Sequence, residues 1–143
     1  MTDTVAVLET NIDDCTGEQF SYCRQKLMES GALDVSFFPL FMKKGRPAYG
    51  LVVICREEDE ETLSRVIFRE TTAVGLRRSV QERRVMERSF ETVETDVGKV
   101  ILKCCRYGEI QKKYVEYESA AALAGETGLP LDEIYRKALS KLP

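Results

Sequence analysis

Apolar residues along the first half of the chain follow two different spacings. Residues 5–8 form a short apolar run of β character, which predicts a first strand that ends near Asn11. Apolar residues then recur at helical spacing, and Thr16 and Gln19 have the spacing of a helix capping box. The pattern therefore predicts a helix over residues 17–30 after the first strand.

A second strand, a tight turn and a third strand are predicted next. Residues 34–42 alternate only in part and contain Pro39, which is typical of an edge or bulged strand. The turn "KKGRP" leads into a third strand over residues 49–55. Asp59 is placed to cap a second helix, whose apolar face continues to about residue 69. The segment "TTAVGLRRSVQ" then returns to β character.

This order of elements indicates an α+β fold. Residues 1–84 read as βαββαβ, which predicts a ferredoxin-like sandwich of the PII type, with two helices on one face of a four-stranded antiparallel sheet. Residues 85–143 read as a β-hairpin turning at "TDVGKV", followed by helices near residues 119–124 and 130–142. No Ser/Gly-rich linker separates the two parts, so we expect a single domain over residues 1–143.

Composition narrows the classes of function. Charged residues make up 31% and hydrophobic residues 43%, and no apolar tract is long enough to cross a bilayer. No secretory signal is visible, so we expect a cytoplasmic protein. The net charge of -3 argues against a general nucleic-acid binder. Histidine is absent and the five cysteines include no CxxC, so metal or acid–base chemistry is expected from carboxylates, lysines or thiols. We assign no metal chemistry to the vicinal pair Cys104 and Cys105, whose side chains would face opposite sides of a strand.

The predicted topology brings three polar loops to one end of the sheet. They are the end of the first strand ("NIDDCTGE"), the hairpin ("KKGRP") and the junction after the second helix ("FRETTAVGLRR"). Each loop alone has a structural explanation. Asp13 and Asp14 can cap the first helix, the hairpin cations can keep an edge strand soluble, and Arg69 with Glu70 can form a solvated pair before two threonines that end the helix.

Together, the loops predict a site for a metal-bound nucleoside triphosphate. Lys43, Lys44 and Arg46 can contact phosphates, and Gly45 lets backbone N–H groups approach closely. Carboxylates are the hard oxygen ligands that Mg²⁺ or Mn²⁺ takes while bridging phosphates. The metal ligands predicted are Asp13, Asp14 and Glu70. Further hydroxyl and backbone donors are predicted at Thr71, Thr72 and Gly75.

Several long motifs follow one another along the chain: "ETNIDDCTGE", "GALDVSFFPLFMKKGRPAY", "FRETTAVGLRR", "VEYESAAALA" and "GLPLDEIYRKAL". With these motifs, nearly the whole chain strongly resembles the C-terminal domain of the LarC nickel-insertion proteins. The resemblance implies part of a CTP-dependent cyclometallase of the lyase class. Such enzymes insert nickel into pyridinium-3,5-bisthiocarboxylic acid mononucleotide to form the nickel-pincer nucleotide cofactor of lactate racemase. It also implies that this domain binds CTP with Mg²⁺ or Mn²⁺, and that nickel, the substrate metal, is bound together with an N-terminal part.

The family pattern carries over to a set of motif positions, which are Asp13, Asp14, Lys43, Lys44, Arg46, Arg69, Glu70, Thr71, Thr72, Gly75 and Arg77. We expect the cations of the hairpin to hold phosphates, and Arg69 or Arg77 to act catalytically by neutralising charge as the bond between the α and β phosphates breaks. Two motifs depart from the family. The family's "MKKGRPG" reads "MKKGRPAYG" here, and its "PEYEDC" reads "VEYESA", so that Ser119 and Ala120 replace an acid and a thiol.

A four-stranded sandwich leaves sheet edges and one sheet face uncovered, so we expect a trimer, or a dimer of trimers, with the site at a subunit cleft. The expected partners are CTP, the pyridinium mononucleotide and the N-terminal part of the enzyme, with no nucleic acid and no membrane. Two other functions stay open. One is a PII-like nucleotide sensor without turnover, and the other is an oligomerisation module whose charged loops contact protein.

Overall fold

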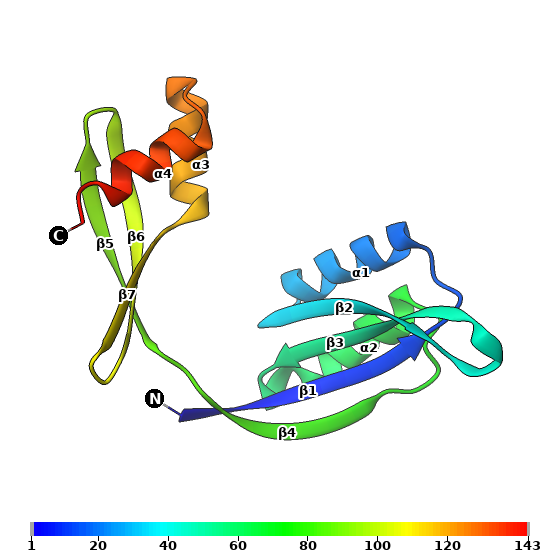
Figure 1. The fold of residues 1–143 in the computed structure, drawn as a ribbon. Coiled ribbons are helices and arrows are strands. Elements are labelled where there is room, and N and C mark those ends of the chain that lie inside the picture. Colours follow the sequence, from blue (N-terminus) through cyan, green and yellow to red (C-terminus); the bar gives the residue numbers. More distant parts are fainter. Residues whose placement is uncertain (1, 143) are drawn as a thin grey trace. The chain divides into compact units, whose positions relative to one another are not determined.

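The computed structural model describes residues 2–142, which form two compact units (Figure 1). One unit is Thr2–Arg83 and the other begins at Arg84. Each has its own antiparallel sheet and its own buried core, so the fold belongs to the mixed α+β class, as predicted. Within the described range, none of the helices has the length and apolar character needed to cross a lipid bilayer.

The first unit contains four strands and two α-helices. In chain order they are β1 (Thr2–Ile12), α1 (Gly17–Glu29), β2 (Asp34–Phe41), β3 (Pro47–Cys55), α2 (Glu60–Glu70) and β4 (Arg77–Arg84). The sheet has the order β2-β3-β1-β4, and β3 pairs antiparallel with both of its neighbours. Asp3 contacts Arg83 and Thr10 contacts Gly75, so β4 also runs antiparallel to β1. The predicted edge position of the strand containing Pro39 is confirmed.

The start of α1 follows the predicted capping box. The Thr16 hydroxyl accepts a hydrogen bond from the Gln19 backbone N–H at 3.2 Å, and the Gln19 side chain accepts one from the Thr16 N–H at 2.8 Å. Two backbone donors that the helix leaves unpaired are thereby satisfied. The loop before this helix carries Asp13 and Asp14, so the cap also fixes where that loop ends.

We predict that Thr16→Ala lowers the free energy of unfolding by about 1 kcal/mol, because it removes the acceptor for the Gln19 N–H. Thr16→Ser is the matched control, since it keeps the hydroxyl oxygen. Urea denaturation followed by circular dichroism measures both variants. Equal stability of Thr16→Ala and the unaltered chain would show that the cap contributes nothing.

Both helices of the first unit pack on the same face of the sheet. One buried cluster joins side chains of α1, α2 and three strands, and it contains Ala6, Leu8, Cys23, Leu27, Ala32, Val35, Leu51, Val53, Cys55, Leu63 and Ile67. Burial raises the pKa of the Cys23 thiol to about 11, with a further contribution from the charge of Glu70, so Cys23 stays a neutral core residue.

The start of α2 differs from the prediction in one respect. Asp59 does occupy the N-cap position, but its side chain makes no capping hydrogen bond. Its carboxylate instead lies 3.8 Å from Arg56, because a short 3₁₀ turn, Glu57–Asp59, leads into the helix and holds Asp59 in a helical backbone conformation. An N-cap side chain needs extended backbone dihedrals to reach the following N–H groups.

The second unit is a three-stranded sheet covered by two helices. Its elements are β5 (Glu87–Thr95), β6 (Gly98–Tyr107), β7 (Ile110–Val115), α3 (Tyr117–Thr127) and α4 (Leu131–Leu139), with the sheet order β5-β6-β7. The predicted hairpin is therefore incomplete, because β7 adds a third strand. The sequence of β7, "IQKKYV", has no fully buried position, so it lacks the apolar alternation that marks a strand.

The two residues of this unit that depart from the family pattern, Ser119 and Ala120, fit its core. Ser119 lies in α3, and its hydroxyl accepts a hydrogen bond from the Ile101 N–H at 2.9 Å. Ala120 is fully buried in a cluster with Val100, Leu102 and residues of both helices. A small side chain suits that close contact between α3 and β6, and the serine satisfies a backbone donor beside it.

Candidate functional site

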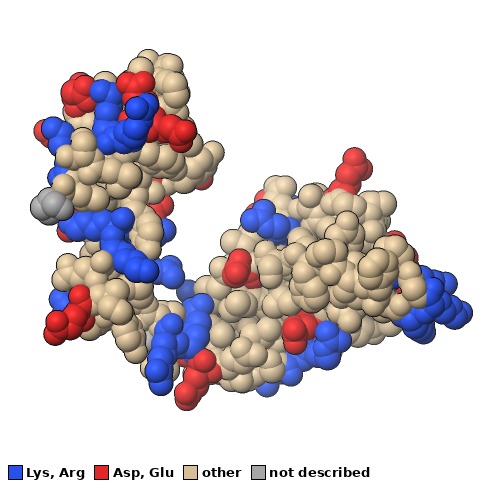
Figure 2. All heavy atoms as spheres, in the orientation of Figure 1, with Lys and Arg blue, Asp and Glu red and all other residues tan. Residues whose placement is uncertain are grey.

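The three predicted loops meet at one end of the first unit. Arg46 of the β2–β3 turn donates from its Nη1 to Oδ2 of Asp13 at 3.3 Å. Thr72, in the segment between α2 and β4, donates its hydroxyl to Asp14 Oδ1 and lies 3.5 Å from the Cys15 sulfur. The loop after β1 therefore touches both of the others. Figure 2 shows Lys and Arg side chains gathered at the end of this unit where the β2–β3 turn lies.

The β2–β3 turn has an unusual backbone. Lys43–Gly45 forms one 3₁₀ turn, within which Lys44 has φ 63° and Gly45 has φ 68°. The Met42 N–H donates to the Arg46 carbonyl at 2.9 Å and closes the turn. A left-handed backbone is uncommon for a non-glycine residue and is found at ligand-binding sites more often than elsewhere. Successive backbone N–H groups in such turns form a concave anion site.

The two lysines of this turn are exposed, and neither forms an ion pair with any residue in the range 2–142. Arg46 is the one cation of the turn that is held by a carboxylate, and its side chain keeps 58% of its surface exposed. The turn thus presents two available ammonium groups beside a guanidinium that Asp13 orients. This arrangement suits phosphate groups, which take point charges and bidentate contacts together.

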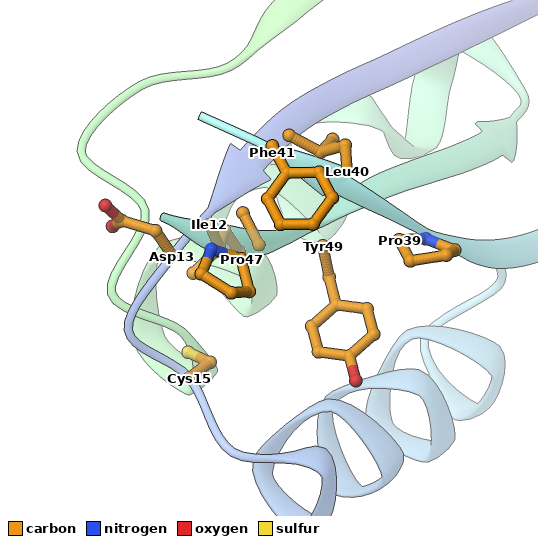
Figure 3. A pocket seen from close by; sticks show the side chains of 9 residues that line it. Ile12, Asp13, Cys15, Pro39, Leu40, Phe41, Pro47 and Tyr49 are labelled. Carbon is orange, nitrogen blue, oxygen red and sulfur yellow. The ribbon is translucent and has the colours of Figure 1, made fainter. Parts of the chain in front are cut away.

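A hollow of about 300 Å³ lies beside this turn (Figure 3). It is lined by Ile12, Asp13, Cys15, Pro39, Leu40, Phe41, Pro47, Ala48 and Tyr49. The Tyr49 ring packs edge-on against Phe20 with ring centroids 5.0 Å apart, whereas Phe41 is 78% exposed. In Figure 3 aromatic rings and prolines surround the hollow, and the Asp13 carboxylate lies at its margin. An apolar hollow with a few charged groups at its edge is typical of a small-molecule site.

Some predicted residues are used within the fold. The Thr71 hydroxyl donates to the Ile67 carbonyl at 2.6 Å and ends α2, which is the structural explanation considered for it. The Gly75 carbonyl accepts from the buried Thr10 hydroxyl at 2.8 Å. The Glu70 carboxylate lies 3.6 Å from Arg69. The pKa of Lys26 on α1 is raised mainly by its hydrogen bond to Glu29, with a smaller contribution from the charge of Glu70, so Glu70 lies near α1.

Two exposed arginines complete the predicted set. Arg69 keeps 86% of its side chain exposed at the end of α2. Arg77 is the first residue of β4 and is also exposed. The neighbouring Arg78 turns to the helix face, where it contacts Glu60, so alternation along the strand turns Arg77 to the opposite face. The structure thus places Arg69 and Arg77 on the segments that flank Thr72.

The carboxylates do not form a ready-made metal cage. Among residues 2–142, no three His, Cys, Asp or Glu side chains converge as they would around a metal ion. Asp13 and Asp14 stay adjacent, one beside Arg46 and the other beside Thr72. Magnesium commonly takes one or two carboxylates and completes its shell with phosphate oxygens and water. Asp13 and Asp14 fit that pattern without a third protein ligand.

Sequence reasoning did not single out the apolar wall of the hollow. Phe41 and Tyr49 line it outside the polar loops, and Cys15 lines it within the loop of Asp13 and Asp14 without having been predicted as a site residue. The available signal is Pro39 and Pro47, which lie on either side of the β2–β3 turn, opposite Tyr49 and Phe41, and line the hollow. Proline on both sides of a charged hairpin could have indicated an uncovered strand end next to the turn.

Comparison with known proteins gives a consistent result. Residues 1–135 match the family model described as nickel insertion protein. The pyridinium-3,5-bisthiocarboxylic acid mononucleotide nickel insertion protein of Alkaliphilus metalliredigens is 43% identical over 129 residues, which are 90% of this chain and 31% of that protein. The protein of the same name from Lactiplantibacillus plantarum is 41% identical over 137 residues, which are 96% of this chain and 33% of that protein. The chain spans about a third of the length of these relatives.

Solved structures resemble the whole chain. LarC2, the C-terminal domain of a cyclometallase involved in the synthesis of the NPN cofactor of lactate racemase, is 40% identical in its apo form. It superimposes with a TM-score of 0.93 over 98% of this chain and 97% of its own. Protein MK0293 from Methanopyrus kandleri AV19 is 24% identical and superimposes with a TM-score of 0.61 over 94% of this chain and 86% of its own. It shares the fold.

Proposed function

The chain belongs to the nickel insertion protein family, and we propose that it is the CTP-binding C-terminal part of an enzyme that inserts nickel into pyridinium-3,5-bisthiocarboxylic acid mononucleotide. The product would be the nickel-pincer cofactor of lactate racemase, with nickel as the substrate metal. The observation that carries the proposal is the meeting of the cationic turn with the Asp13 and Asp14 loop beside an apolar hollow. A nucleoside triphosphate needs these three elements, namely a phosphate cradle, metal ligands and room for a planar base.

The residues of the turn fit a triphosphate. Lys43, Lys44 and Arg46 would hold the phosphates, together with the backbone N–H groups around Gly45. Asp13 and Asp14 would hold Mg²⁺ or Mn²⁺, with Glu70 as a further candidate. When CTP is bound, attack of a nucleophile, from the substrate or from water, on its α phosphate would form a bond to CMP and release pyrophosphate, and this cleavage could drive the insertion. Thr72 would keep Asp14 oriented, as it does through its present hydrogen bond.

Arg69 and Arg77 are proposed as the catalytic cations. Both are exposed and lie on either side of the Thr72 segment, so neither is committed to the core. A guanidinium near the bond that breaks would neutralise the charge that develops on the phosphates. From the family resemblance, the whole enzyme is proposed to be a lyase that consumes CTP.

We further propose that residues 2–83 are ferredoxin-like and PII-like. The element order βαββαβ, the sheet order β2-β3-β1-β4 and the common face of both helices support this classification. A cytoplasmic trimer, or a dimer of trimers, is the proposed assembly. Its support is the four-stranded sheet, whose edge strands β2 and β4 have no further strand beside them among residues 2–142. Light scattering coupled to gel filtration tests the assembly.

Isothermal titration calorimetry with CTP and with ATP, each with and without Mn²⁺, tests the function. The expected result is binding of CTP that Mn²⁺ strengthens. If neither nucleotide binds, the phosphate site is refuted and the oligomerisation module gains support. Tighter binding of ATP than of CTP would favour a PII-like sensor instead.

Replacing Lys44 separates backbone strain from charge at the turn. We predict that Lys44→Gly lowers the affinity for CTP by about 3- to 10-fold, because a phosphate-facing point charge is lost. The free energy of unfolding should stay within about 0.5 kcal/mol, because glycine relieves the left-handed strain while the unfolded chain gains freedom. Lys44→Ala, measured by the same calorimetry and urea denaturation, should lose the same affinity. A stability loss above ~1 kcal/mol in Lys44→Gly would contradict the strain argument.

A further inference from the structure

A second hollow, of about 380 Å³, lies entirely within the second unit and has no part in the site described above. Its lining residues come from all three strands and are Glu87, Arg88, Ser89, Glu91, Cys104, Cys105, Arg106, Gln111, Lys112 and Lys113. The volume falls within the range of about 300–1,000 Å³ that is typical of small-molecule sites. Unlike the first hollow, its lining is dominated by polar and charged side chains.

The hollow continues the inner face of the sheet beyond its helices. Leu102 on β6 is buried under α3 and α4, and alternation along the strand puts Cys104 and Arg106 on the same face. Ser89 and Lys113 are the direct neighbours of Cys104 on the adjacent strands, and Glu87 and Gln111 are those of Arg106. Figure 1 shows both helices at one end of this sheet, which leaves the other end of the strands uncovered.

The hollow holds charges of both signs. On the face that carries Cys104, strand pairing places two cations, Arg106 and Lys113, and two acids, Glu87 and Glu91, whereas Arg88 and Lys112 pair with Cys105 on the other face. Lys113 has a carboxylate partner among the described residues, Glu91 at 2.6 Å. Arg106 lies on the same face with no ion pair in that range. Figure 2 shows Lys and Arg side chains over this unit with Asp and Glu side chains among them. Arg106 and Lys113 on this face, with Gln111 and Ser89 as neutral donors, can recognise phosphate and carboxylate groups, and Glu87 and Glu91 can face a cationic ring.

We propose that this hollow binds the pyridinium mononucleotide on which the enzyme acts, through its phosphate and thiocarboxylate groups. This inference rests on the proposed function, because the substrate is taken from the names of related proteins. That molecule carries two anionic substituents on a positively charged pyridinium ring, and a phosphate on the attached sugar. Arg106 would hold one anionic group by paired hydrogen bonds, and Lys113 would hold another as a point charge once it leaves Glu91.

CTP is a poorer occupant of this hollow. A nucleoside triphosphate binds together with a divalent ion, so its site needs carboxylates that coordinate the same ion. The two acids here are Glu87 and Glu91, and Glu91 already accepts from Lys113. The Asp13 and Asp14 loop of the first unit offers adjacent carboxylates next to free lysines. The two hollows therefore suit two different ligands of one reaction.

Each hollow contains a partly exposed cysteine that can report its occupancy. Cys15 lines the first and Cys104 lines the second, whereas Cys23, Cys55 and Cys105 are buried. Partial desolvation and the neighbouring Glu91 raise the pKa of the Cys104 thiol, so alkylation is best run at about pH 8.5, where more thiolate is present. Peptide mass spectrometry then gives the labelling rate of each thiol separately.

The experiment uses the full chain and nicotinic acid mononucleotide, a pyridinium nucleotide with a ring carboxylate, as the probe. We expect it to slow iodoacetamide labelling of Cys104 at least about 5-fold and to leave Cys15 unchanged. CTP with Mn²⁺ should slow Cys15 and leave Cys104 unchanged. Labelling of Cys104 that the probe does not slow, with Cys15 protected by CTP, would overturn this inference and leave the proposed function standing. Protection of Cys104 without any CTP effect at Cys15 would overturn the CTP site and support the second hollow.

Variants test which groups hold the probe. Arg106→Gln and Lys113→Gln should each weaken binding of nicotinic acid mononucleotide about 10-fold in calorimetry, because each removes one charged contact. Lys99→Gln is the matched control, since Lys99 lies on the same strand, is 71% exposed and does not line the hollow. Inorganic phosphate at equal concentration should protect Cys104 less than the probe does. Equal protection would overturn the assignment of the hollow to a pyridinium nucleotide.

Discussion

Arg46→Ala is expected to weaken CTP binding by about 10- to 100-fold. Arg46 is the cation of the turn that a carboxylate holds in place, through its contact with Asp13 at 3.3 Å. Hydrogen bonds to charged groups contribute roughly 1.5–3 kcal/mol each, which corresponds to this range of affinity. The Arg46 side chain is 58% exposed, and such surface pairs add only about 0–1 kcal/mol to folding. Calorimetry should therefore show a large loss of affinity while urea denaturation shows little change.

Two further variants sharpen this prediction. Arg46→Lys keeps the charge and loses the planar guanidinium, so it should recover only part of the affinity if the contacts are bidentate. Arg65→Ala is the matched control, because Arg65 is an exposed arginine on α2 with its own acidic partner, Glu61. If Arg46→Ala binds CTP as tightly as the unaltered chain, Arg46 is only a solvated charge of the hairpin.

Much of the fold was predictable because its elements bury one face each. The spacing that buries Phe20, Cys23 and Leu27 identifies α1, and the capping box marks its first turn. β7 was missed because its lysines leave it without a fully buried side, and a strand held mainly by backbone pairing shows no alternation. The spacing of apolar residues indicates which side chains are buried. An exposed strand has no such spacing, so it is recognised only from the strand with which it pairs.

The site shows the same division between topology and side-chain detail. Connectivity alone places the loops around Asp13, Arg46 and Thr72 at one end of the sheet, and the structure shows contacts among them. The direction of each side chain depends on local competition. The Thr71 hydroxyl donates a hydrogen bond to a helix carbonyl, and Glu70 lies near α1. No spacing rule distinguishes these conformations from ligand-facing ones. The sequence therefore predicts which loops form the site better than it predicts which side chains point at a bound ligand.

Leu63→Ala is expected to cost the first unit about 3–5 kcal/mol of unfolding free energy. Leu63 is fully buried in the cluster that joins α2 to α1 and the sheet, so alanine leaves a cavity as well as losing apolar burial. Phe68→Ala is the matched control on the same helix. Phenylalanine is the larger side chain, but Phe68 is 45% exposed, so its removal should cost less. Urea denaturation followed by circular dichroism measures both variants. A larger loss for Phe68→Ala would show that the α2 face carrying Phe68 is covered in solution, as it would be in the proposed trimer.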